Sequence, residues 1–153
     1  MGKQERLIAQ ITQLIAVLDK KEQQEIFDNL FKSKGIPISA FKSDLSGLEI
    51  IVRYLKDTEK MAFKEIAILL NRKLPTIYTT YRISQKKWKN KLDITDNSHV
   101  IPTNIFGNRK HSILESIVAY MHDTERLQFK EISKLIGRKY PTIVTVYNRY
   151  KKK

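Results

Sequence analysis

A segment of 28 residues occurs twice in this chain in closely related form, and this duplication constrains the fold more than any other feature. Residues 54–81 read YLKDTEKMAFKEIAILLNRKLPTIYTTY and residues 120–147 read YMHDTERLQFKEISKLIGRKYPTIVTVY, so sixteen of the 28 aligned residues are identical. An internal repeat of this kind predicts two copies of one supersecondary unit. The chain is therefore expected to contain two similar small folds, one after the other.

Each copy has the pattern of three short helices. An S-x-x-E sequence, which is typical of a helix capping box, begins the first helix at Ser46 and again at Ser112. We expect this first helix over residues 47–57 and 113–123.

The second helix of each copy is expected over residues 63–70 and 129–136. It ends at Asn71 in the first copy and at Gly137 in the second, and both residue types tolerate the left-handed backbone that closes a helix. A proline then follows in each copy, where it suits the first turn of a third helix. Three helices separated by one tight turn in this order are the pattern of a helix-turn-helix.

An Ile-Pro dipeptide precedes each copy, at residues 36–37 and 101–102. Proline disfavours the helical conformation in the residue before it. We therefore expect an extended lead-in segment before each group of three helices.

The N-terminal residues lie outside the repeat and are expected to form a helical hairpin. Apolar residues recur at steps of four and three in the first helix, as in the seam of a short coiled coil, at Leu7, Ile11, Leu14 and Leu18. Asp19 and Glu22 have the spacing of a capping box for a second helix. Its apolar stripe consists of Ile26, Phe27, Leu30 and Phe31. Because small monomers rarely expose so much apolar surface, a homodimer through residues 3–33 is expected; packing of these helices on the first repeat is the alternative.

These patterns predict an all-α fold, with an N-terminal helical hairpin followed by two tandem tri-helical helix-turn-helix repeats. The expected boundaries are 1–35 for the hairpin, 36–88 for the first repeat, 89–100 for a linker and 101–153 for the second repeat.

The chain carries a formal net charge of +13, of which residues 1–34 contribute +1, the linker 0 and the two repeats the remaining +12. Nucleic acid is the most common partner of such a surface, and an anionic membrane face is the rival. No apolar run approaches the roughly 20 residues needed to cross a bilayer, and cysteine is absent. A cytoplasmic, nucleoid-associated protein with no membrane partner is expected.

The segment FKEIAILLNRKLPTIYTTYR resembles the helix-turn-helix of region four of bacterial sigma factors and of the quorum-sensing regulators. In those families a Glu-Ile-Ala triplet precedes a Leu pair, a turn residue and a Thr-Val pair. Those places are taken here by Glu65-Ile66-Ala67, Leu69-Leu70, Asn71 and Thr76-Ile77, and in the second copy by Glu131-Ile132-Ser133, Leu135-Ile136, Gly137 and Thr142-Ile143. The likeness to small archaeal proteins with sigma-like helix-turn-helix domains is closer still. The resemblance covers both repeats but not residues 1–34.

One position departs from the pattern of these families. They usually place Ser or Asp at the N-cap of the recognition helix, where this chain has Lys73 and Lys139. A lysine cannot accept a hydrogen bond from the first N–H groups of the helix. Either a DNA phosphate supplies the acceptor, or the helix begins one residue away.

The resemblance implies that the third helix of each repeat is a recognition helix in the major groove of DNA. Ile77 and Tyr81, like Ile143 and Tyr147, share the face that is expected to pack inward. Short hydroxyl and methyl groups on the opposite face are suited to base edges, whereas the cations are expected to contact mainly phosphate, with a guanine edge as the alternative for Arg82. The predicted DNA-binding residues are Arg72, Lys73, Thr76, Tyr78, Thr79, Arg82, Lys86, Arg138, Lys139, Thr142, Val144, Thr145, Asn148 and Arg149. A mobile tail of residues 151–153 is expected to add phosphate contacts.

Other chemistry finds little support in the sequence. The histidines His99, His111 and His122 lack the spacing of metal ligands, and no phosphate-binding loop or nucleophile motif is present. We therefore expect no catalytic residues, no metal, no cofactor and no small-molecule ligand, and a protein that is not an enzyme.

The leading hypothesis is a protein that binds double-stranded DNA, and most simply a sequence-specific transcription regulator. An architectural protein that coats or bridges DNA is the second choice. An alternative of another class is a protein-interaction module that docks on the transcription machinery, because sigma region four also makes such contacts.

Overall fold

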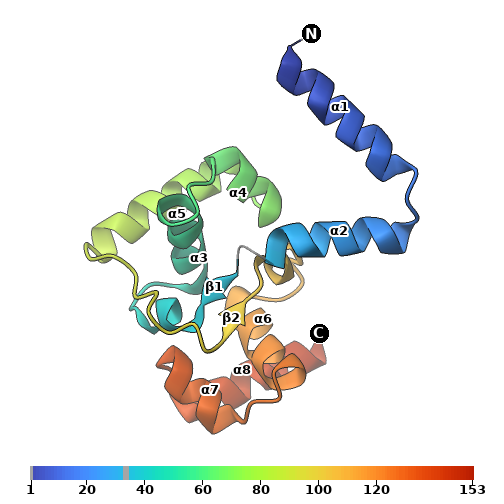
Figure 1. Cartoon of the computed structure of the whole chain (residues 1–153). Helices are drawn as coiled ribbons and strands as arrows, with labels where there is room; N and C mark the ends of the chain where they lie inside the picture. The colour runs from blue at the N-terminus through green and yellow to red at the C-terminus, as the bar shows by residue number, and fades with distance from the viewer. Residues whose placement is uncertain (1, 33–34) are drawn as a thin grey trace. The chain divides into compact units, whose positions relative to one another are not determined.

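The computed structural model describes residues 2–32 and 35–153, with the side chains of residues 27–34 left undescribed. The chain is mostly helical, which confirms the predicted all-α fold class (Figure 1). It divides into two compact units, residues 1–33 and residues 34–153, and each is described by itself. In the described residues, no helix is long and apolar enough to cross a membrane.

The N-terminal unit contains α1 (Lys3–Ala16) and α2 (Lys20–Lys32). The predicted capping box of α2 is present: the Asp19 N–H donates to a Glu22 carboxylate oxygen at 3.2 Å, and the Glu22 N–H donates to Asp19 Oδ1 at 2.8 Å. Within this unit α1 buries none of its residues; Leu7, Ile11 and Leu14 of its apolar seam are exposed, whereas Leu18, which follows the helix, is half-buried. Of the expected stripe on α2, Ile26 is also exposed, whereas Phe27, Leu30 and Phe31 lie outside the described side chains.

The C-terminal unit contains both repeats. The first consists of α3 (Gly47–Asp57), α4 (Phe63–Leu69) and α5 (Leu74–Lys87). The second consists of α6 (Ile113–Ala119), α7 (Phe129–Ile136) and α8 (Tyr140–Lys152). The helix expected over residues 113–123 therefore ends earlier, because a π-helical turn, η3 (Tyr120–Thr124), replaces its last part.

The two serine caps position the first helix of each repeat. The Ser46 hydroxyl accepts from the Glu49 N–H at 3.3 Å, and the Ser112 hydroxyl accepts from the Glu115 N–H at 3.1 Å. The expected capping box also requires the glutamate side chain to accept from the N–H of the capping serine. This part of the prediction is wrong, because the side chains of Glu49 and Glu115 each accept instead from a distant lysine. Buried isoleucines, among them Ile50 in α3, then anchor these helices in the core.

The lead-in segments are extended, as predicted from their prolines, but they also pair with each other. Strand β1 (Ile36–Pro37) and strand β2 (Val100–Ile101) are antiparallel, with Ile36 opposite Ile101. Figure 1 shows the pair in the middle of this unit, between α3–α5 on one side and α6–α8 on the other. The two repeats, expected as separate domains, thus form one compact unit.

Short 3-10 helices follow the strands and cross to the other repeat. The helix η1 (Ile38–Lys42), which precedes the first repeat, packs against α7 of the second. The helix η2 (Thr103–Gly107), which precedes the second repeat, packs against α4 of the first. Each places one fully buried or nearly buried phenylalanine, Phe41 and Phe106, in the core. Each repeat therefore completes its core with a segment that belongs to the other.

This exchange is reciprocal, so a local two-fold axis relates the repeats. Ile36 pairs with Ile101, its own counterpart in the second lead-in. Gly47 lies against Ile113, and both are the residue that follows the capping serine; a Cβ atom on Gly47 would be 2.6 Å from Ile113 Cγ2. Equivalent residues meet each other only at a two-fold axis.

Candidate nucleic-acid interface

The helices α5 and α8 were predicted to be recognition helices, and each has one buried and one exposed face. Ile77, Thr80 and Ser84 are buried in α5, and Ile143 and Val146 are buried in α8. These side chains face α3 and α4 in the first repeat and α6 and α7 in the second. The opposite faces carry most of the predicted DNA-binding residues, which are exposed at Lys73, Thr76, Tyr78, Thr79, Arg82, Lys86, Lys139, Thr142, Thr145, Asn148 and Arg149.

The N-terminal ends of both helices have the unusual cap that the sequence indicates. Lys73 and Lys139 are the N-cap residues, with extended backbone and exposed side chains, and neither forms a side-chain capping bond within residues 35–153. The alternative that the helices begin one residue away is therefore wrong. Free N–H groups at the start of a helix, next to an ammonium group, form a favourable environment for an anion.

One threonine on each exposed face has surroundings that match those of its counterpart in the other repeat. Thr79 donates its hydroxyl proton to the Pro75 carbonyl at 3.0 Å, and Thr145 donates to the Pro141 carbonyl at 2.9 Å. Since the proton of each hydroxyl is used within the helix, the oxygen remains an acceptor and the methyl group remains available for apolar contact. Both properties suit base edges in a major groove, such as an amino group or a thymine methyl.

The aromatic position on this face differs between the repeats. Tyr78 is 46% exposed, and its ring lies 4.6 Å from that of Phe63 in α4. Val144, its counterpart, is half-buried, so the prediction of an exposed side chain there is only partly met. Tyr78 is thus held against α4 with one edge open to a partner, whereas Val144 offers a small apolar surface.

The arginines after the two turns lie at the junction between the repeats. Arg138 is half-buried, and its guanidinium donates to the Leu45 carbonyl at 3.4 Å. Arg72 is also half-buried, and burial together with the charge of Arg109 from the second repeat lowers its pKa. These two predicted phosphate contacts therefore differ from Lys73 and Lys139, which are exposed at the helix ends.

Both α5 and α8 are tied to the first helix of their repeat by a tyrosine. The Tyr81 hydroxyl donates to Asp57 Oδ1 at 2.6 Å, and the Tyr147 hydroxyl donates to Asp123 Oδ1 at 2.7 Å. Burial and the bond to Asp57 raise the pKa of Tyr81 to about 12. The bond to Asp123 and burial raise the pKa of Tyr147 as well. These half-buried tyrosines therefore pack inward, as the resemblance implies, and also fix the helix through their hydroxyl groups.

A second pair of contacts holds the C-terminal ends of the same helices. Lys87 Nζ lies 2.9 Å from Glu49 Oε1, and Lys153 Nζ lies 2.9 Å from Glu115 Oε1. Both glutamates are buried. The expected mobile tail is therefore wrong: α8 continues to Lys152, and Lys153 forms an ion pair with a buried carboxylate.

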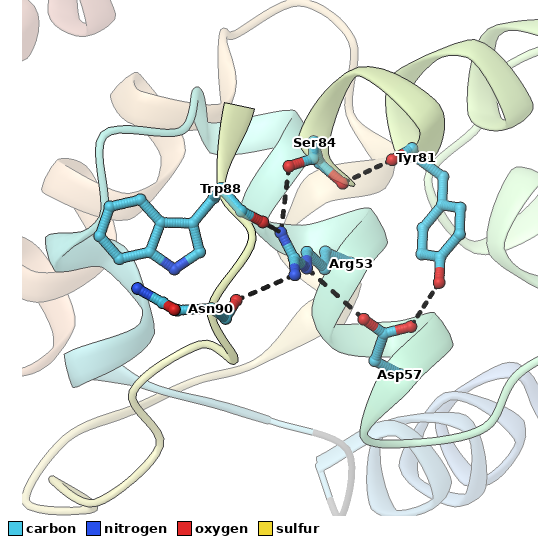
Figure 2. A network of polar contacts seen from close by, with 6 residues as sticks. All are labelled: Arg53, Asp57, Tyr81, Ser84, Trp88 and Asn90. Atoms are coloured by element: carbon cyan, nitrogen blue, oxygen red, sulfur yellow. Dashed lines mark hydrogen bonds and ion pairs between the residues drawn. The ribbon is translucent and has the colours of Figure 1, made fainter. Parts of the chain in front are cut away.

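The first repeat has one further restraint, which Figure 2 shows. The buried guanidinium of Arg53 lies at the C-terminal end of α5, where it donates to the carbonyl groups of Ser84 at 3.0 Å, of Asn90 at 2.9 Å, and of Trp88. Its Nε also lies 3.5 Å from an Asp57 carboxylate oxygen. A cation placed against the last carbonyl groups of a helix satisfies them and interacts favourably with the helix dipole. The second repeat has Ala119 at the position of Arg53.

Some of these restraints could have been found from the sequence. Glu49 and Lys87 are separated by the same number of residues as Glu115 and Lys153, so the duplication itself marks both pairs. Arg53 left no such signal, because its partners are backbone carbonyl groups and its counterpart is an alanine.

Comparisons of the chain with protein-family models, with curated proteins and with solved structures found no match. The function proposed below therefore depends on the sequence and the geometry of this interface.

Proposed function

We propose that this protein binds double-stranded DNA through α5 and α8, and that it acts as a sequence-specific transcription regulator. The observation that carries the proposal is the matched pair of exposed helix faces. Each begins at a lysine N-cap that forms no side-chain capping bond in the described part of the chain, and each continues with two exposed threonines. Each is fixed to its repeat by the same Tyr–Asp and Lys–Glu contacts. Rigid helices with short polar side chains and flanking cations suit major-groove readout.

The charge of the chain supports the same partner. Of the net charge of +13, residues 35–88 carry +5 and residues 101–153 carry +7, and Coulomb attraction to phosphate contributes much of the affinity of such proteins for DNA. The exposed cations Lys73, Lys86, Lys139 and Arg149 surround the threonine faces on both helices.

The experiment is fluorescence anisotropy on a random-sequence duplex across a salt series, with the full chain. The double variant Lys73→Ala/Lys139→Ala should reduce the magnitude of the slope of log K against log salt by about 2, because each lost phosphate contact contributes about 0.9. The matched control is Lys20→Ala/Lys21→Ala, which removes the same charge from exposed positions of α2. Equal slopes in both variants and the wild type, with the fold intact, would show that the docking face is elsewhere.

A second function in the same class is supported by α1. Its exposed apolar seam, which includes Leu7 at 48%, Ile11 at 54% and Leu14 at 68% exposed, suits pairing with a second chain. A dimer would contain four recognition helices, as an architectural protein that coats or bridges DNA requires. A folded protein that binds no duplex at physiological salt would instead favour the interaction module that docks on the transcription machinery.

A further inference from the structure

The symmetry of the C-terminal unit determines how its two recognition helices relate to each other. The pairings of Ile36 with Ile101 and of Gly47 with Ile113 place a local two-fold axis between the repeats. The same axis therefore relates α5 to α8. A DNA duplex also has two-fold axes perpendicular to its length, and a two-fold arrangement of recognition helices matches half-sites in inverted orientation.

Contacts across the junction make this relation rigid. The side-chain amide of Asn71, in the turn before α5, donates to the Gly107 carbonyl at 3.3 Å. Gly137 is the corresponding turn residue of the second repeat. A Cβ atom built on it would lie 3.9 Å from the Cα atom of Lys42, in the first lead-in. Both turns thus rest on the exchanged segment of the other repeat. A change in the position of either turn relative to the other repeat would break these contacts.

Positive charge is also continuous across the junction. Arg72, beside the turn of the first repeat, lies close enough to Arg109 of the second for the two cations to repel each other. The Nε of Arg72 is buried and lacks a hydrogen-bond partner within the described part of the chain. A DNA phosphate between the two half-sites would relieve this repulsion. A single duplex that passes both repeats would bring its backbone to these cations, in agreement with the two-fold relation of α5 and α8.

The exposed faces of the two helices are alike at some positions and different at others. Thr76 matches Thr142, and Thr79 matches Thr145, but Arg82 is replaced by Asn148. All six side chains are exposed. Arginine makes its best base contact with guanine, whereas asparagine makes its best base contact with adenine.

From these observations, and on the basis of the DNA binding proposed above, we infer that one chain reads an imperfect inverted repeat on a single duplex. The half-sites share the bases that face the threonines. They differ at one position, where the half-site under α5 has guanine opposite Arg82 and the half-site under α8 has adenine opposite Asn148.

The test is selection of bound sequences from a random duplex library by the full chain. The expected product contains two half-sites in inverted orientation, identical except at one guanine-versus-adenine position. Arg82→Asn should convert the selected site into a symmetric one with adenine in both halves, and Asn148→Arg should produce guanine in both. Binding assays on the selected duplexes should give each variant a roughly 5- to 100-fold preference for its own symmetric site.

The other outcomes separate this inference from the proposed function. Selection of a direct repeat, of a single half-site, or of no preferred sequence would overturn the inference and leave DNA binding itself intact. A bridging assay gives a further outcome that would overturn the inference. It asks whether an Ile11→Lys variant, shown by light scattering to be monomeric, holds a labelled duplex on a second, immobilised duplex. Such bridging by one chain would mean that α5 and α8 face different duplexes. Failure to retain any duplex at low salt would overturn both.

Discussion

Replacing Arg53 by alanine should destabilise the protein through the end of α5. The guanidinium makes three hydrogen bonds to backbone carbonyl groups and an ion pair with Asp57. Hydrogen bonds to charged groups contribute about 1.5–3 kcal/mol each, but burial of the charge costs several kcal/mol, so the contributions do not simply add. Removal of one side of a buried charged network costs about 3–5 kcal/mol. The Asp57 side chain is 45% exposed and can be hydrated, so we expect the lower end, about 3 kcal/mol.

Urea unfolding of the full chain, followed by far-ultraviolet circular dichroism at neutral pH, measures this loss. The matched control is Arg82→Ala, which removes an exposed arginine from the same helix and should change the free energy of unfolding by no more than about 0.5 kcal/mol. Hydrogen exchange should also become faster in the last turn of α5 in the Arg53 variant. A loss below about 1 kcal/mol, or an equal loss in both variants, would refute the assigned role of Arg53.

Three further predictions concern the junction, the tyrosines and α1. In a thermal unfolding assay, Gly47→Ala should cost about 1–3 kcal/mol of stability, because the new Cβ would lie 2.6 Å from Ile113 Cγ2 at the two-fold axis. The control is Gly2→Ala, whose Cβ would meet no atom within 4 Å. The pKa of Tyr81 is raised from 10.0 to about 12 on folding, so its contribution to the free energy of unfolding is complete below pH 10 and is lost as the pH rises to 12. Tyr81→Phe should therefore make the loss of stability with alkaline pH less steep. An unchanged profile of stability against pH would contradict this. Light scattering should give twice the 18.0 kDa chain mass for the wild type and a single mass for Ile11→Lys, and a wild-type monomer would exclude the seam as an interface.

The local structure of the repeats was predictable because it is encoded in short patterns. Capping serines at Ser46 and Ser112, turn residues at Asn71 and Gly137, and apolar spacing each act within a few residues of chain. The approximate positions of the helices and the exposed threonine faces followed from such patterns, whereas the early end of α6 at Ala119 and the start of α5 after Lys73 did not.

The relation between the repeats was not predictable from the same patterns. An Ile-Pro dipeptide indicates an extended segment, but nothing in it indicates that Ile36 pairs with Ile101 or that η1 packs on α7. These are contacts between distant parts of the chain, and they depend on shape and not on local propensity. For the same reason Arg72 and Arg138, expected as simple phosphate contacts, lie at the junction of the two repeats.

The exchanged lead-in segments also affect how the protein is made on the ribosome. The helices of the first repeat, up to α5, are synthesised before residues 103–107, yet η2 covers α4. At roughly 5–20 residues per second, the ribosome needs a few seconds to supply that segment after α4. During this interval the first repeat has an exposed apolar surface where η2 will dock, and a second nascent chain could occupy it. Pairing of two chains through their lead-in segments is thus the characteristic error expected in the biosynthesis of this fold.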